Sequence, residues 1–238
     1  MADPTPAQAP KAYTYIVEHL DPELGPWSEL EYACIAKETQ ACAPAQNGGG
    51  STFCLSSLPP SLKVPEALLA RSPTFRAETR GVEDMYPGPE DKRRVCLLDP
   101  QAERDLCPED AKAFGAFLFG GILGDDPPRD RTSELRKKGF EGRRLGPVQM
   151  TTDTAVRVTR MVIEEQFSYP LIPKLNERPP DTLTTIPYVD FPELKFNEHE
   201  STQMPFRYVK GPDGKPIMPD GMIDLIKKDA DKSIDDLF

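Results

Sequence analysis

The sequence has few of the residues that mark a metal site, a disulfide framework or a membrane span. It contains two histidines, His19 and His199, and five cysteines without a CxxC pair, so a zinc site and a set of disulfides are both disfavoured. No apolar run approaches the roughly 20 residues of a membrane-spanning helix, and the first residues lack the basic and apolar blocks of a signal peptide. We therefore expect reduced thiols, no bound metal and no membrane. The expected compartment is the cytoplasm, with the nucleus as the other choice.

Three common catalytic or nucleotide-binding motifs are also missing. The glycine-rich stretch cannot be aligned with GxGxxG, because Phe119 and Leu123 occupy the positions where glycine would be needed. There is no GxxxxGK[ST] segment, and a serine nucleophile elbow is disfavoured. These absences argue against the usual Rossmann cofactor loop, a P-loop nucleotide site and a serine hydrolase.

The composition instead shows an acidic chain that is rich in proline. The 238 residues carry a net charge of -10, with 27 prolines and 16 glycines. This length allows one core of roughly 150 residues with appendages, or two small domains. Nucleic-acid affinity comes mainly from Lys and Arg that neutralise phosphates. An acidic body therefore favours a basic protein partner, although acidity that serves only solubility is the commoner explanation.

Short apolar runs alternate with helical patterns, which predicts an α/β domain with a largely parallel sheet. A capping box of Ser28 and Glu31 would start the first helix. In the last helix of this domain, Arg157 and Arg160 lie off the apolar face. After residue 168 the sequence becomes an extended segment with a pair of strands within 195–209, a turn at 211–214 and a helix from 220. The predicted strands are 13–17, 52–55, 94–98, 114–118 and about 143–145, and the predicted helices are 27–39, 65–70, 108–113, 132–138 and 152–167.

Glycines and polar residues gather where several of these strands end. Ligands in open α/β sheets bind beyond the carboxyl ends of the strands. We therefore expect one site there, while short connecting turns that use Gly and Pro only for geometry are the alternative. The segments that arrive at this edge are Glu18-His19, Asp99-Pro100, Gly120-Gly121 with Asp125, and 146–152.

Two long motifs carry a resemblance to a known family. Residues 117–135, FLFGGILGDDPPRDRTSEL, and residues 143–155, RRLGPVQMTTDTA, resemble the SPOUT class of S-adenosylmethionine-dependent methyltransferases. They are similar above all to the fungal SPOUT enzymes that methylate an arginine of a small-subunit ribosomal protein. Residues 15–19, YIVEH, with Trp27 and Glu31-Tyr32 extend the resemblance, which covers roughly residues 13–210 with gaps.

The resemblance implies a SPOUT-like, trefoil-knotted α/β domain over 12–168. The residue pattern on either side of it predicts a disordered, Ala- and Pro-rich N-terminus over 1–11 and an extended C-terminal segment over 169–238 with short strands and a terminal helix. The resemblance also implies a monomer. S-adenosylmethionine would lie bent in the knot, held largely by backbone groups. The matching cofactor positions are Leu98, Asp99, Pro100, Phe119, Gly120, Gly121, Ile122, Leu123, Gly124, Leu145, Gly146, Gln149, Met150, Thr151 and Thr152.

The chemistry of arginine methylation adds candidate catalytic residues. A guanidinium group, with a pKa above about 12, needs a carboxylate that orients it and takes up a proton. Asp125, directly after the glycine loop, is the first choice, and Glu18 at the end of the first strand is the second. The alternatives are that Asp125 stabilises its own turn and that Glu18 pairs with an arginine.

A basic cluster could hold the cofactor carboxylate or RNA, although a solvated helix face is the commoner meaning of such a pattern. RNA-methylating members of the class commonly have an Asn-rich and Arg-bearing stretch where this chain has Glu18-His19-Leu20. RNA contact is therefore compatible with the sequence but not required. The cluster consists of Arg129, Arg131, Lys137, Lys138, Arg143 and Arg144.

The preferred interpretation is an S-adenosylmethionine-dependent protein arginine N-methyltransferase that acts on a small-subunit ribosomal protein. The alternatives are an RNA methyltransferase of the same fold and a non-catalytic adaptor that binds ribosomal proteins.

Overall fold

The computed structural model describes residues 12–41, 50–71, 73–120, 132–164, 183, 185–198 and 200–235. Their centre is a six-stranded, parallel sheet with the order β3-β2-β1-β5-β4-β6. This confirms the predicted α/β fold with a mostly parallel sheet, whereas the trefoil knot stays a prediction. The strands are β1 (Thr14–Glu18), β2 (Thr52–Ser56), β3 (Phe75–Ala77), β4 (Val95–Leu98), β5 (Ala116–Gly120) and β6 (Glu141–Arg143).

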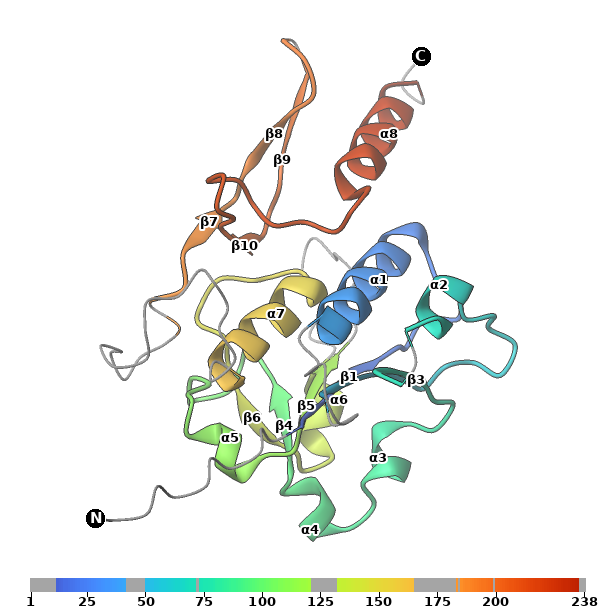
Figure 1. Cartoon of the computed structure of the whole chain (residues 1–238), viewed down its shortest axis with the longest axis vertical. Helices are drawn as coiled ribbons and strands as arrows, with labels where there is room; N and C mark the ends of the chain where they lie inside the picture. Colours follow the sequence, from blue (N-terminus) through green and yellow to red (C-terminus); the bar gives the residue numbers. More distant parts are fainter. Residues whose placement is uncertain are drawn as a thin grey trace, which may run out of the picture.

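Eight helices accompany the sheet in the described part of the chain (Figure 1). Two of them, α1 and α7, lie side by side and pack on each other. They are α1 (Pro26–Ala41), α2 (Glu66–Leu69), α3 (Val82–Met85), α4 (Pro89–Lys92), α5 (Asp110–Ala113), α6 (Thr132–Lys137), α7 (Thr152–Ile163) and α8 (Met222–Asp235).

Both faces of the sheet are buried, because helices cover each of them. Successive side chains of a strand point to opposite faces. Tyr15 and Phe117 join the hydrophobic cluster under α1 and α7, while their neighbours Ile16 and Leu118 join the cluster that contains residues of α3 and α6. The central strands can therefore be apolar at every position, as is usual in parallel sheets.

The first helix is confirmed, but its predicted capping box is wrong. The helix begins at Pro26, where the fixed φ of proline suits the first helical turn. The Ser28 hydroxyl donates to the carbonyl of Gly25 at 3.0 Å from within the helix. Because the helix starts earlier than predicted, Glu31 lies in its second turn and on its buried side.

Two predicted strands are displaced by about two residues. The strand predicted over 114–118 is β5, and the strand predicted near 143–145 is β6. Phe114 follows the end of α5 and is buried before the strand begins, so the apolar run is longer than the strand. The short elements β3, α3 and α4 were missed, because three or four residues give no usable periodicity.

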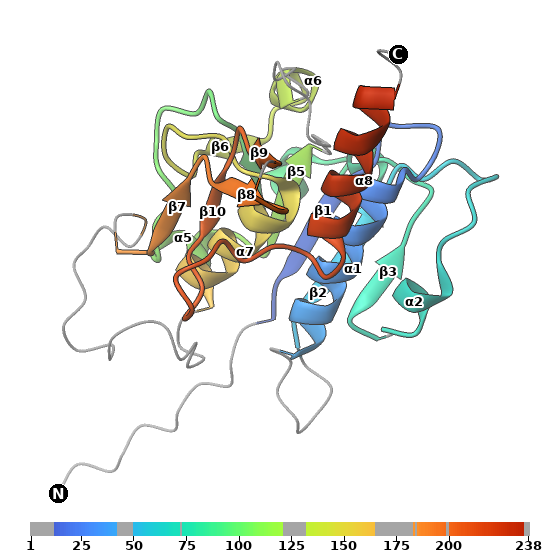
Figure 2. The same ribbon diagram turned by 90° about the horizontal axis from the view of Figure 1, so that it is seen from above.

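The C-terminal segment forms a small unit that packs against α1. It contains two antiparallel strand pairs and α8, and Figure 2 shows α8 beside α1. Trp27 and Leu30 of α1 join the apolar cluster of this unit. The strands are β7 (Tyr188–Asp190), β8 (Glu193–Lys195), β9 (Ser201–Gln203) and β10 (Arg207–Val209).

Several predictions concern residues that lie outside the described part. These are the disordered N-terminus over 1–11, the end of the predicted helix 152–167 beyond residue 164, and the boundary between residues 168 and 169. No described helix is long and apolar enough to cross a membrane.

Candidate functional site

The carboxyl ends of three neighbouring strands meet at one edge of the sheet. In the observed register Glu18 of β1 lies beside Gly120 of β5, and Leu98 of β4 lies beside Phe119. The strand order also changes direction here, since β2 and β3 lie on one side of β1 and β4, β5 and β6 on the other. Ligands of open α/β sheets bind at such a switch point. The predicted convergence of strand ends is therefore confirmed for Glu18, Asp99 and Gly120.

A cavity of about 500 Å³ lies at this edge, which is within the usual size range for small-molecule sites. Its walls come from the ends of β4 and β5, from the loop between β6 and α7, and from the first turn of α7. The loop passes through Gly146 with φ of +85°, a conformation that favours glycine. The lining residues are Leu98, Asp99, Pro100, Gln101, Phe119, Gly120, Thr132, Arg144, Leu145, Gly146, Pro147, Val148, Gln149, Met150, Thr152 and Ala155.

Most of the residues predicted to hold a cofactor lie in this wall. Thr151 is buried directly before α7 and does not line the cavity. The segment 121–125 lies outside the described residues. It contains the predicted cofactor residues Gly121, Ile122, Leu123 and Gly124 and the first catalytic choice, Asp125. The predicted residues that line the cavity are Leu98, Asp99, Pro100, Phe119, Gly120, Leu145, Gly146, Gln149, Met150 and Thr152.

Six lining residues were not among the predicted cofactor residues. They are Gln101, Thr132, Arg144, Pro147, Val148 and Ala155. Thr132 is the first residue of α6, and the start of a helix that follows a parallel strand belongs to the same edge of the sheet. The position of Thr132 at this edge could therefore have been predicted from the sequence. Gln101 directly follows the predicted Pro100, and the other four lie within the motif 143–155.

Asp99 forms part of the cavity wall as an ionised carboxylate. Arg136 donates to both of its oxygens at 2.5 and 2.7 Å, and the Thr132 hydroxyl and the Gln101 backbone N–H donate to Oδ1 at 3.0 and 2.9 Å. Burial alone would raise the pKa of Asp99, but these hydrogen bonds lower it below its ordinary value. The carboxylate is thus fixed in place by four donors.

Glu18 is buried at the end of β1, with an exposed fraction of 3%. Its Oε1 accepts hydrogen bonds from the Ser57 hydroxyl at 2.9 Å and from the Val82 backbone N–H at 3.1 Å. Its Oε2 is buried and has no hydrogen-bond partner within the described part of the chain. Ser57 has a positive φ of 58°, which is uncommon for a residue with a side chain. Glu18 therefore has one oxygen held rigidly and one available, and its catalytic role stays a prediction.

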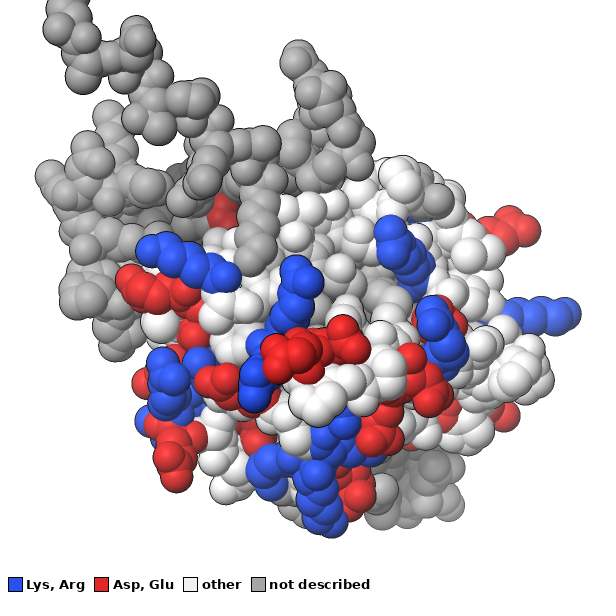
Figure 3. Space-filling model, turned by 90° about the horizontal axis from the view of Figure 1, so that it is seen from below, with Lys and Arg blue, Asp and Glu red and all other residues white. Residues whose placement is uncertain are grey.

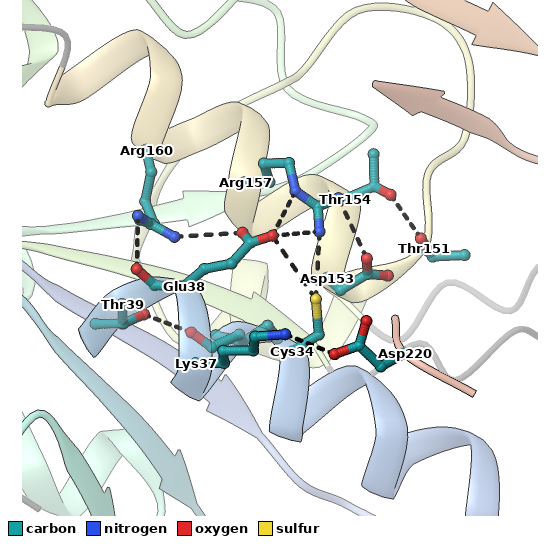
Figure 4. Close-up of polar contacts among 11 residues, drawn as sticks. Cys34, Lys37, Glu38, Thr39, Thr151, Asp153, Thr154, Arg157, Arg160 and Asp220 are labelled. Carbon is teal, nitrogen blue, oxygen red and sulfur yellow. Dashed lines mark hydrogen bonds and ion pairs between the residues drawn. The ribbon is translucent and has the colours of Figure 1, made fainter. Parts of the chain in front are cut away.

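A buried ion network joins α7 to α1 (Figure 4). Glu38 Oε1 accepts from Arg157 at 2.7 and 2.9 Å, and Glu38 Oε2 pairs with Arg160 at 3.4 Å. Arg157 also pairs with Asp153 at 3.3 Å. The sequence pattern places Arg157 and Arg160 off the apolar face of this helix, and the structure shows that they are nevertheless buried, with exposed fractions of 1% and 5%. The network fixes the first turn of α7, which lines the cavity.

A second buried acid lies beside this first turn. Glu31 is 0% exposed, and its Oε1 accepts from the Trp27 indole N–H at 3.2 Å. Burial, and after it the charge of Asp153, raise the pKa of Glu31 well above its ordinary value, while the N–H and hydroxyl of Thr152 counteract this rise. The pKa of Asp153 is also raised by burial. Glu31 was singled out in the sequence only as a capping residue and as part of the resemblance.

The predicted basic cluster does not form a free positive surface where it is described. Arg143 is 3% exposed, and each described member has an acidic partner. Figure 3 shows one face of the molecule, on which the described acidic and basic side chains are interspersed. Arg129 and Arg131 lie outside the described residues. The pairs are Lys137 with Glu134, Lys138 with Glu83, Arg143 with Asp110, and Arg144 with Asp105.

The chain is similar to known proteins over almost its whole length. A family model described as "Protein arginine N-methyltransferase SFM1-like" matches residues 14–233. The protein arginine N-methyltransferase SFM1 of Saccharomyces cerevisiae is 42% identical over 233 residues, which cover 94% of this chain and 99% of the yeast protein.

Solved structures of the yeast enzyme agree with this. A crystal structure of yeast SFM1 complexed with SAM has a TM-score of 0.72 and 41% identity, and the match covers 93% of each chain. A complex of yeast SFM1 with SAH has a TM-score of 0.71 and 40% identity, over 90% of this chain and 94% of the yeast chain.

Proposed function

Because the chain belongs to the SFM1-like family of protein arginine N-methyltransferases, we propose that its cavity binds S-adenosylmethionine for methyl transfer to an arginine of a small-subunit ribosomal protein. Family membership confirms the resemblance drawn from the sequence and the predicted enzyme class. The cofactor prediction agrees with the yeast complexes. The observation that carries the proposal is the cavity, because ten of the predicted cofactor residues line it.

The cavity residues suit this cofactor chemically. Leu98, Phe119, Leu145 and Met150 give apolar walls that fit an adenine ring. The cavity also reaches Thr152, the first residue of α7, and the N-terminal N–H groups of a helix stabilise an anion such as the cofactor carboxylate. When bound, S-adenosylmethionine supplies an electrophilic methyl group.

A carboxylate of the chain must orient the acceptor arginine. In the balanced reaction a guanidinium nitrogen gains the methyl group and loses one proton, the sulfur–methyl bond breaks, and S-adenosylhomocysteine remains. A carboxylate hydrogen-bonded to the guanidinium holds its plane and takes the proton. We propose Asp125 and Glu18 as the candidates for the uptake of this proton. Glu18 is supported by its buried Oε2, which has no hydrogen-bond partner among the described residues.

The charge of the protein supports a basic protein substrate over RNA. The net charge is -10, and each described member of the basic cluster is paired with an acid. Phosphate binding depends on available Lys and Arg. Ribosomal proteins are basic, so long-range attraction favours their encounter with an acidic enzyme. We further propose that the enzyme acts in the cytoplasm as a monomer, with its C-terminal unit covering part of α1.

Cofactor binding and methyl transfer by the purified protein test this function directly. The purified protein should bind S-adenosylhomocysteine in calorimetry and should transfer label from S-adenosylmethionine to a protein of extracted small ribosomal subunits. The labelled product should resist nuclease and should yield methylarginine on acid hydrolysis. Nuclease-sensitive label would support the RNA methyltransferase, and cofactor binding without transfer would support the adaptor. Absence of cofactor binding would contradict the proposed function as a whole.

A further inference from the structure

Three buried oxygen atoms near the first turn of α7 have no hydrogen-bond partner in the described part of the chain. They are Glu31 Oε2, Asp153 Oδ1 and Tyr208 Oη, and their residues are 0%, 1% and 1% exposed. Buried polar atoms are nearly always hydrogen-bonded, because leaving one unpaired away from water costs free energy. Three such atoms in one region indicate that a donor group belongs there.

These atoms come from three separate elements. Glu31 lies on α1, Asp153 on α7 and Tyr208 on β10. The backbone N–H of Arg207 donates to the carbonyl of Gln149 at 2.8 Å, which holds β10 against the loop before α7. After burial, the charges of Asp153 and Glu31 are the causes that raise the pKa of Tyr208. The three side chains are therefore close enough to act on one another, and the fold assembles them from distant parts of the sequence.

Among the described residues, the charges of this region are one cation short. Three buried or half-buried carboxylates, Glu31, Asp153 and Glu38, accompany two guanidinium groups, Arg157 and Arg160. Arg157 forms ion pairs with Glu38 and Asp153, and Arg160 forms one with Glu38. A buried carboxylate without a cationic partner is unstable and takes up a proton instead. The pKa of Glu31, which burial raises well above its ordinary value, agrees with this, since a raised pKa means that the carboxyl group binds a proton more readily than in water.

The acidic pair lies next to the cavity. Thr152 lines the cavity, and its N–H and hydroxyl act on Glu31. On the other side, the half-buried Trp27 covers Glu31 and donates to it. Thr152 is thus the residue that separates a cation bound by the acidic pair from the cavity in which we propose that the cofactor binds.

We propose that Glu31, Asp153 and Tyr208 form the site that receives the guanidinium group of the substrate arginine. This inference rests on the proposed function and assigns the acceptor side of the same site. A guanidinium group carries five N–H donors in a plane, which can serve three oxygens that come from different directions. Its charge replaces the proton on the acidic pair. The carboxylates then fix the plane of the guanidinium beside the methyl donor.

The test compares Glu31→Gln with Glu29→Gln, a change of an exposed glutamate on the same helix. Both variants and the wild type are assayed for methyl transfer to proteins extracted from small ribosomal subunits, with S-adenosylmethionine at saturation. We expect Glu31→Gln to lower kcat/KM at least tenfold while the Kd for S-adenosylhomocysteine changes less than twofold. Glu29→Gln should match the wild type. Transfer by Glu31→Gln within twofold of the wild type would overturn the proposal.

The pH profile separates this role from a structural one. The titratable and charged groups that face Glu31 are Asp153 and Tyr208, with Arg157 and Glu38 behind Asp153. Because Glu31 must lose its proton when the guanidinium binds, kcat/KM of the wild type should rise with pH. This rise should be reduced in Glu31→Gln. An unchanged profile in the variant would contradict the proposal.

Thermal unfolding excludes loss of structure as the cause. The folded protein keeps a proton on Glu31 that the unfolded chain releases above about pH 4.3, so the acid destabilises the fold increasingly as pH rises from there. Glu31→Gln removes this effect and should keep or raise Tm. If Glu31→Gln fails to fold, Tyr208→Phe decides, since it removes one acceptor and no charge. A reduced kcat/KM with intact cofactor binding in Tyr208→Phe supports the proposal, and an unchanged kcat/KM overturns it. Failure of the wild type to bind S-adenosylhomocysteine would instead contradict the proposed function.

Discussion

Replacing Arg157 by methionine should lower the free energy of unfolding by about 3–5 kcal/mol. Arg157 is 1% exposed and hydrogen-bonds Glu38 at 2.7 and 2.9 Å and Asp153 at 3.3 Å. Burial alone would lower the pKa of Arg157, but the charges of Glu38 and Asp153 raise it, so the guanidinium stays charged. Its removal leaves Asp153 without a cationic partner among the described residues, and leaves the half-buried Glu38 with Arg160. Urea denaturation followed by circular dichroism measures the loss.

Arg93→Met is the matched control, because Arg93 forms an exposed ion pair with Glu90 at 2.6 Å. Exposed pairs contribute little to stability, so its denaturation midpoint should stay close to that of the wild type. The double variant Arg157→Met, Glu38→Gln should lose less stability than the sum of the two single variants, since both changes break the same network. An Arg157→Met protein with an unchanged midpoint would show that the network does not hold α7 to α1.

The sequence predicts the layers of this fold well, because strand and helix periods are local properties. The central strands of the sheet are apolar on both faces, which only a covered parallel sheet explains. The side chains of α7 show where this reasoning fails. The pattern of the helix places Arg157 and Arg160 off its apolar face and does not show that they are buried, because their partner Glu38 comes from a helix more than a hundred residues earlier in the chain. Partners that distant in sequence cannot be inferred from the pattern of one helix.

One part of the candidate site could likewise be predicted from the sequence, and another part could not. The cavity wall was predictable, because loops that follow parallel strands gather at one edge of a sheet. The acidic pair was not, since Glu31 has the spacing of a capping box and Asp153 has the position of a helix-stabilising acid. Only tertiary packing of α1, α7 and β10 shows that Tyr208 lies with them. Asp125, the first catalytic choice, stays a prediction.

Replacing Gly146 by valine should weaken binding of S-adenosylhomocysteine by about 30- to 150-fold. Gly146 has φ of +85° in the cavity wall, and a β-branched residue is strongly disfavoured there. Forcing a side-chain-bearing residue into such a conformation costs about 2–3 kcal/mol, and each 1.4 kcal/mol corresponds to about a tenfold change in affinity. If the free loop relaxes to a negative φ, binding must restore the strained form, and the cost appears in Kd. Isothermal titration calorimetry measures this change.

Gly139→Val is the control with the same backbone change away from the cavity. Gly139 has φ of +87°, and a Cβ at either glycine would meet no atom within 4 Å, so both substitutions add backbone strain without a clash at Cβ. Gly139 lies between α6 and β6 and does not line the cavity. Both variants should therefore lose similar stability in thermal unfolding, but only Gly146→Val should lose affinity. Equal affinities in the two variants would mean that the loop between β6 and α7 does not hold the cofactor, and the cavity would have to be reassigned.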